Sequence, residues 1–112
     1  MTISKNTDIA ALLNRAYATK KGDYASLLSF EGRDDYLAFV SAWKAHYKGV
    51  VQEIRDLKEE RRDKTRSIAA RNGANLARQS LRHDARTLIG LRLAGKEIAR
   101  AHHRAKHVDK AA

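Results

Sequence analysis

Seven lysine and arginine residues recur on one face of a helix predicted in the second half of the chain. With about 100° of rotation per residue, they fall within about 120° of arc. A solvated helix face normally mixes both signs of charge, whereas this set is almost uniformly cationic. Because arginine donates in pairs to phosphate oxygens, the set predicts binding to backbone phosphates with little base readout. This basic stripe consists of Arg78, Arg82, Arg86, Arg92, Lys96, Arg100 and Arg104.

Two apolar residues, Ile89 and Leu93, lie inside the basic stripe. They either dock an N-terminal helical cap or contact a protein partner, and the first role is the one we expect. The charged block at residues 58–66 lies near the predicted tip of a hairpin and is either a solvated helix end or a contact for a partner. Its candidate partner contacts are Arg61, Arg62, Lys64 and Arg66.

Histidines near the end of the chain raise the question of a metal site. His103 and His107 are one helical turn apart, a spacing that can hold zinc. No cysteine occurs in the chain, and Asp109, in the expected C-terminal tail, is the nearest carboxylate. We therefore expect no metal, with this pair as a weak candidate. Since no phosphate-cradling glycine loop, serine elbow or HExxH motif is present, we also predict a non-enzymatic protein without a cofactor.

Charge is distributed unevenly along the 112 residues. The net charge is +10, and residues 1–57 hold eight Lys/Arg against seven Asp/Glu, whereas residues 58–112 hold fifteen against six. Such asymmetry points to a polyanionic partner, either nucleic acid or an acidic protein surface. Apolar residues make up 43% and charged residues 32%, which is typical of a helical protein in water.

Two long helices must position these residues. Apolar residues follow one another at alternating steps of four and three, as in a coiled coil. They are Tyr36, Val40, Trp43, Tyr47, Val50, Ile54 and Leu57. The pattern predicts an all-α fold: a long antiparallel hairpin of helices at about 34–71 and 75–107, turning at Asn72-Gly73. A helix that runs straight through Gly73 in an extended coiled-coil dimer is the competing model, because an interior glycine costs only about 1 kcal/mol.

Folding back at Gly73 makes the numbers of facing residues sum to about 145. Leu57 would then meet Leu88, and Ile54 would meet Leu91. Tyr47 would meet Ile98, Val50 would meet Gly95, and Arg61 would form an ion pair with Asp84.

A short helical cap is predicted at about residues 7–30. Ile9, Leu12, Leu13 and Ala16 have helical spacing, with Thr7 as the expected N-cap. The cap should cover the base of the hairpin at Leu37, Phe39 and Leu93. Residues 1–112 would form one domain, with 1–6 and 108–112 flexible.

Three functions are compatible with these features. We expect first a protein that binds DNA or RNA through the basic stripe. The alternative is an adaptor or inhibitor, for example one encoded by a phage or plasmid, that docks on an acidic surface of a larger complex. The third is a self-assembling coiled-coil component, for which a homodimer would be natural. No run reaches transmembrane length and no signal-peptide core is present, so we expect a cytoplasmic protein that does not engage a membrane.

Overall fold

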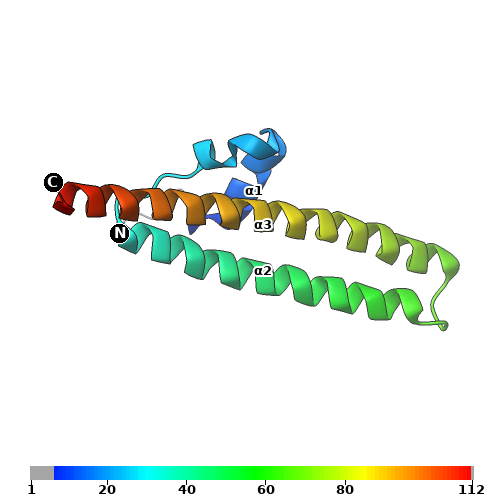
Figure 1. Ribbon diagram of the computed structural model, residues 1–112. Helices are drawn as coiled ribbons and strands as arrows, with labels where there is room; N and C mark the ends of the chain where they lie inside the picture. The colour runs from blue at the N-terminus through cyan, green and yellow to red at the C-terminus, as the bar shows by residue number, and fades with distance from the viewer. Residues whose placement is uncertain (1–6, 112) are drawn as a thin grey trace.

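The computed structural model describes the backbone of residues 7–111 and the side chains of residues 7–20 and 22–105. Four helical elements follow one another: α1 (Ile9–Tyr17), the 3-10 helix η2 (Lys21–Leu27), α2 (Arg33–Arg62) and α3 (Ile68–Ala111). α2 and α3 pack side by side in opposite directions and form a hairpin (Figure 1). The expected all-α hairpin with an N-terminal helical cap is therefore confirmed.

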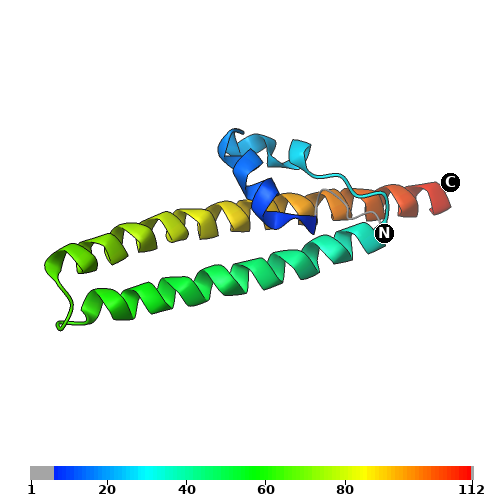
Figure 2. The ribbon, with the colours of Figure 1, turned by 180° about the vertical axis from the view of Figure 1, so that it is seen from behind.

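The hairpin is long and thin, with principal extents of 68 × 28 × 24 Å. Its length follows from the helices themselves, because 30 residues of α helix span about 45 Å. α1 lies across one face of the hairpin, toward the viewer in Figure 2, and η2 runs along α3. The opposite face, toward the viewer in Figure 1, has no element over it among the described residues.

The turn between the long helices lies about seven to nine residues before the predicted one. α2 ends at Arg62 and α3 begins at Ile68, so Asn72-Gly73 is inside α3 and the predicted turn there is wrong. Two side chains organise the true turn. The Asp63 carboxylate accepts hydrogen bonds from the Thr65 N–H (2.9 Å) and hydroxyl (2.6 Å), and the Ser67 hydroxyl caps α3 by accepting from the Ala70 N–H (3.1 Å).

Moving the turn changes every predicted pairing between the helices. The Trp43 indole N–H donates to the Leu88 carbonyl (2.7 Å), and the Arg61 guanidinium donates to the Asn75 side chain (3.5 Å). Facing residue numbers therefore sum to about 131–136, instead of 145. The predicted pairs are wrong as a set: Leu57 with Leu88, Ile54 with Leu91, Tyr47 with Ile98, Val50 with Gly95, and Arg61 with Asp84.

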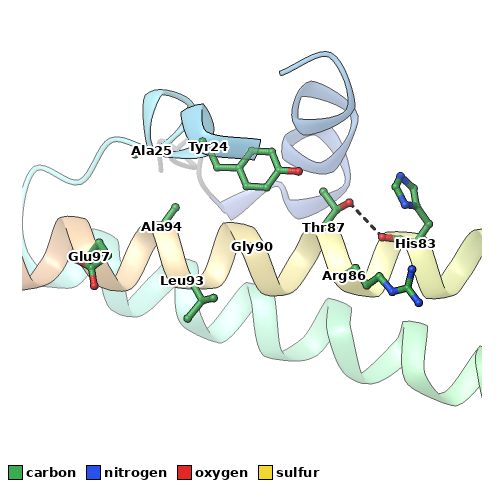
Figure 3. Close-up of a pocket in the computed structure, with 10 residues that line it drawn as sticks. Tyr24, Ala25, His83, Arg86, Thr87, Gly90, Leu93, Ala94 and Glu97 are labelled. Atoms are coloured by element: carbon green, nitrogen blue, oxygen red, sulfur yellow. Dashed lines mark hydrogen bonds between the residues drawn. The ribbon is translucent and has the colours of Figure 1, made fainter. Parts of the chain in front are cut away.

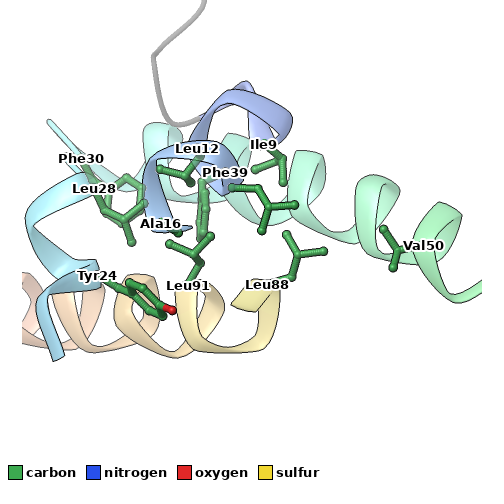
Figure 4. Packing of buried hydrophobic residues seen from close by; sticks show 11 residues of the cluster. Ile9, Leu12, Ala16, Tyr24, Leu28, Phe30, Phe39, Val50, Leu88 and Leu91 are labelled. Carbon is green, nitrogen blue, oxygen red and sulfur yellow. The ribbon is translucent and has the colours of Figure 1, made fainter. Parts of the chain in front are cut away.

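The core lies where α1 crosses the hairpin. Phe39 and Leu91 are fully buried between the long helices and the apolar side of α1, which contributes Leu12 and Ala16 (Figure 4). The Asp8 carboxylate caps α1 by accepting from the Ala11 N–H (3.1 Å), so Asp8 and not Thr7 is the N-cap. Fixed in this way, α1 covers Phe39 and leaves Leu37 and Leu93 exposed, contrary to the expected cover of all three.

The heptad face of α2 is used inside the chain. Phe39 and Val50 are buried, and Tyr36, Val40, Trp43, Tyr47 and Ile54 are partly buried against the core. The Trp43 and Tyr47 rings stack with centroids 4.7 Å apart. The competing straight coiled-coil dimer would need this face for a second chain, whereas here α3 occupies it.

Candidate polyanion-binding face

The uncovered face of the hairpin can be located from the residues under the cap. Phe39 on α2 and Leu91 on α3 are both fully buried, with α1 over them. Side chains that lie about 120–180° around each helix from these two point away from the cap, at about 100° per residue. We call this set the open face. Its cationic and apolar members considered below are Leu37, Lys44, Lys48, Val51, Arg55 and Arg62 on α2, and Arg71, Arg78, Arg82, Ile89, Leu93, Lys96 and Arg100 on α3. The same arc also includes Arg86 and Arg104 and, toward the helix ends, the acidic residues Asp34, Glu59 and Glu97.

Cations from both helices dominate the open face. Lys44, Lys48, Arg55 and Arg62 are exposed on α2, as are Arg82, Lys96 and Arg100 on α3. Between residues 37 and 58 of α2, and between 71 and 96 of α3, the structure places no Asp or Glu within this arc. Neighbouring packed helices lie about 8–10 Å apart, so the two rows of cations lie close to each other. A surface of this kind attracts polyanions.

Within the row on α2, Lys44, Lys48 and Arg55 were not predicted from the sequence, whereas Arg62 was a candidate contact of the charged block. Lys48, Arg55 and Arg62 are seven residues apart, a spacing that keeps them on one side of a helix. The net charge of residues 1–57 is small, so composition alone does not indicate a cationic surface on this helix.

The basic stripe is only partly free for a ligand. Arg92 is half-buried, its guanidinium donates to the Tyr36 hydroxyl (2.9 Å), and its Cζ lies 5.6 Å from the Tyr36 ring centroid. Arg100 pairs loosely with Glu97 at 3.4 Å, where both side chains are exposed. Arg82, Arg86, Lys96 and Arg104 are exposed. The stripe therefore keeps its cationic character, while Arg92 also serves as a structural link between α3 and α2.

Arg78 has an unusual environment within the stripe. The residue is half-buried, and its Nε is shielded from solvent without a hydrogen-bond acceptor. It is the one such side-chain atom among the side chains described. A donor left in this state costs about 1–3 kcal/mol.

Ile89 and Leu93 lie on the open face, and the cap does not bury them as expected. Ile89 is 44% exposed and Leu93 is 58% exposed. The cap instead packs on another side of α3, where Tyr24 is buried and Thr87 lies beneath it (Figure 3). Ile89, Leu93 and Leu37, which is 47% exposed, are apolar side chains that lie among the cations of the open face.

The candidate contacts of the charged block divide between the turn and a pocket. Arg62 and Lys64 are exposed. The Arg66 guanidinium pairs with Glu60 at 2.9 Å and lies 3.8 Å from Asp63, which holds it across the turn. Arg61 instead points to α3 and lines a pocket at the hairpin tip with Arg71 and Asn75.

A second hollow lies between η2 and α3 (Figure 3). It has a volume of about 520 Å³, and its lining includes Tyr24, Arg86, Thr87 and Leu93. The Tyr24 ring covers Gly90 so closely that a Cβ there would lie 2.7 Å from the ring. Thr87 donates its hydroxyl to the His83 carbonyl (3.1 Å), leaving the hollow mainly apolar, which suits packing of the cap more than charge recognition.

The residues described contain no cluster of three or more His, Cys, Asp or Glu able to hold a metal ion. The weak candidate pair is not tested, because the side chain of His107 lies outside the described residues while His103 is exposed on α3. None of the described helices combines the length and the apolar composition needed to cross a membrane.

Comparison with known proteins gave no relatives: no protein-family model, no curated protein and no solved structure matches the chain.

Proposed function

We propose that this chain is a non-enzymatic protein that binds a nucleic-acid backbone on the open face of its hairpin. The observation that carries the proposal is the presence of two cationic rows on one face, one from each long helix. Carboxylates enter that arc only toward the helix ends, at Asp34, Glu59 and Glu97. From Arg71 to Arg100 the row on α3 extends about 44 Å at 1.5 Å per residue. A phosphate backbone can follow that length.

Recognition on such a surface is expected to depend on phosphates more than on bases. Lysine and arginine contacts to phosphate position a protein on nucleic acid without reading its sequence. The aromatic rings that could stack on bases are used elsewhere, since Trp43 and Tyr47 stack on each other between the helices. Affinity should therefore fall steeply with salt and vary little with sequence.

The test is binding of fluorescent duplex DNA, duplex RNA and single strands across a salt series. The test variant, Arg55→Gln/Arg82→Gln, removes one cation from each row. Its matched control, Arg15→Gln/Lys20→Gln, removes two exposed cations on and just after α1. We expect the test variant to flatten the plot of log K against log salt by about two units, and the control to match the wild type. Equal effects of both variants would contradict the proposal.

The exposed Ile89 and Leu93 favour a second candidate, an adaptor that docks the open face on an acidic protein surface. Apolar side chains surrounded by charge are typical of protein interfaces. The variant Ile89→Ser/Leu93→Ser separates the two functions, because it keeps every cation. Unchanged nucleic-acid binding by this variant supports the first function. Failure of the wild type to bind any nucleic acid at low salt supports the adaptor.

A further inference from the structure

A pocket at the tip of the hairpin is built almost entirely from hydrogen-bond donors. It has a volume of about 320 Å³ and is lined by Arg61 at the end of α2 and by Ile68, Arg71, Asn72 and Asn75 in the first two turns of α3. Two guanidinium groups and two carboxamides therefore surround one small space, and no carboxylate is among the lining residues. Each guanidinium carries five N–H donors in a fixed planar arrangement.

Both arginines are held in place before any ligand arrives. Arg71 donates from Nε to the carbonyl of Arg61 (2.9 Å), a group in the last turn of α2. Arg61 donates from Nη1 to Oδ1 of Asn75 (3.5 Å). The Arg61 and Arg71 side chains are half-buried, unlike the exposed cations of the open face. Groups fixed in this way lose less conformational freedom on binding, and partial burial reduces screening of their charge.

The neighbouring carboxylates are engaged with other partners. Glu60 pairs with Arg66 at 2.9 Å, and Asp63 accepts two hydrogen bonds from Thr65. Those hydrogen bonds, with smaller contributions from the charges of Arg66 and Arg71, lower the pKa of Asp63. The pocket also lies at the N-terminal end of the 44-residue helix α3, where the helix dipole favours an anion. Positive potential in the pocket thus comes from the Arg61 and Arg71 guanidinium groups and from the N-terminal end of α3, and the ionised Asp63 near Arg71 reduces it in part.

We propose that the tip pocket is a binding site for one phosphate group, either free or at the end of a larger molecule. Two guanidinium charges match a phosphate dianion, and their planar N–H pairs match its oxygens. Asn72 and Asn75 add neutral donors at the rim. Arg71 also belongs to the open face, but Arg61 does not, so the pocket can be tested apart from the proposed nucleic-acid binding.

The experiment follows the amide and side-chain signals of the full chain by NMR during titration with inorganic phosphate, at constant ionic strength set with chloride. We expect saturating shifts confined to residues 61–75 in the wild type, and at least ten-fold weaker binding in Asn75→Leu and Arg61→Gln. Arg15→Gln removes an exposed arginine on α1, outside both the pocket and the open face, and should behave as the wild type. Arg61→Lys keeps the charge but not the planar donor pairs, so it should bind at an intermediate level if it folds.

Oligonucleotides with a 5′-phosphate or a 5′-hydroxyl then distinguish the two sources of phosphate. Tighter binding of the phosphorylated strand, lost in Asn75→Leu, identifies an end-bound phosphate, whereas equal binding of both strands identifies free phosphate as the ligand. Non-saturating shifts, or equal phosphate affinity in Asn75→Leu and wild type, would overturn the pocket proposal. Saturation by phosphate without any salt-dependent nucleic-acid binding would overturn the proposed function and leave the pocket intact.

Discussion

Trp43 and Leu88 are joined by a hydrogen bond that fixes how the two long helices are aligned. The indole Nε1 donates to the Leu88 carbonyl at 2.7 Å, across 45 residues of sequence. Leu88 is fully buried, so the bond is sheltered by the core. A slip of either helix by one turn would break it.

Replacement of Trp43 by phenylalanine should therefore destabilise the protein. The loss of the hydrogen bond costs about 1 kcal/mol, and the smaller ring adds about 1–2 kcal/mol through lost packing. Urea unfolding followed by circular dichroism measures the change. Tyr47→Phe, which keeps the stacked ring, is the control and should change stability by less than about 0.5 kcal/mol. Similar stabilities for the two variants would argue against the Trp43–Leu88 bond.

Two helical glycines should respond to alanine with opposite signs. A Cβ at Gly95 would lie 2.7 Å from Cε1 of the fully buried Phe39, whereas a Cβ at Gly49 would meet nothing within 4 Å. Alanine is favoured over glycine in a helix by about 1 kcal/mol. We expect Gly49→Ala to stabilise by about that amount and Gly95→Ala to destabilise by about 1–3 kcal/mol. Thermal unfolding compares them directly, and stabilisation by both would mean that Phe39 does not pack there.

The fold class was predictable from the sequence because the heptad pattern of α2 and the amphipathic pattern of α3 extend over many turns. The turn was not, because several weak local signals compete. Asn72-Gly73 resembles a helix end, yet its cost inside a helix is only about 1 kcal/mol, which packing along α3 can offset. The residues that form the turn are Asp63, which accepts a hydrogen bond from Thr65, and Ser67, which caps α3. They lie inside a run of charged residues whose pattern is also compatible with a continuous helix.

Gly73→Ala tests this placement of the turn. None of the described glycines has a positive φ angle, and a Cβ at Gly73 would meet nothing within 4 Å. The substitution should therefore stabilise the protein by about 0.5–1 kcal/mol. A glycine in a left-handed helix cap would give the reverse, a loss of about 1 kcal/mol. The urea concentration at the unfolding midpoint should rise in the first case and fall in the second.

The candidate site was predictable only in part, because its composition depends on how elements are placed. A helical wheel of α3 groups Arg82, Lys96 and Arg100 correctly, but it cannot tell which side of the helix the cap will choose. For this reason the sequence led to the expectation that Ile89 and Leu93 pack under the cap. Lys48 and Arg55 join the same surface only because α2 and α3 are antiparallel and α1 covers the opposite face, which no single-helix pattern contains.

Asp84 should make stability fall as pH rises through its raised folded pKa. Burial raises its pKa above the ordinary value of 3.8. The folded protein then holds the proton more tightly than the unfolded chain, so the contribution is present below pH 3.8 and lost as pH rises through the folded pKa. Asp84→Asn should therefore be more stable than the wild type at pH 7, with the difference shrinking at low pH. A difference that is constant with pH would contradict this assignment.

Asp63 should give the opposite pH dependence, since hydrogen bonds from Thr65 lower its pKa. Its contribution is present above pH 3.8 and is lost as pH falls through the lower folded pKa. Asp63→Ala should therefore be less stable than the wild type at neutral pH, and the two should converge in acid. Urea unfolding of both aspartate variants in one pH series measures the two effects together. Because the two pKa shifts are opposite, the stability differences from the wild type should have opposite signs at neutral pH.

Arg78 should link stability to binding. Because its Nε is buried without an acceptor, Arg78→Met removes an unsatisfied donor while keeping an unbranched apolar stem, and we expect stabilisation by about 1 kcal/mol. The same change removes one cation from the open face and should reduce the salt slope of nucleic-acid binding by about 1. Arg82→Met, at an exposed position, should lower the slope similarly without stabilising the protein. Stabilisation by Arg78→Met with an unchanged slope would mean that Arg78 is strained but takes no part in binding. Destabilisation would mean that Nε has an acceptor in solution, and Arg78 would then be a structural residue like Arg92.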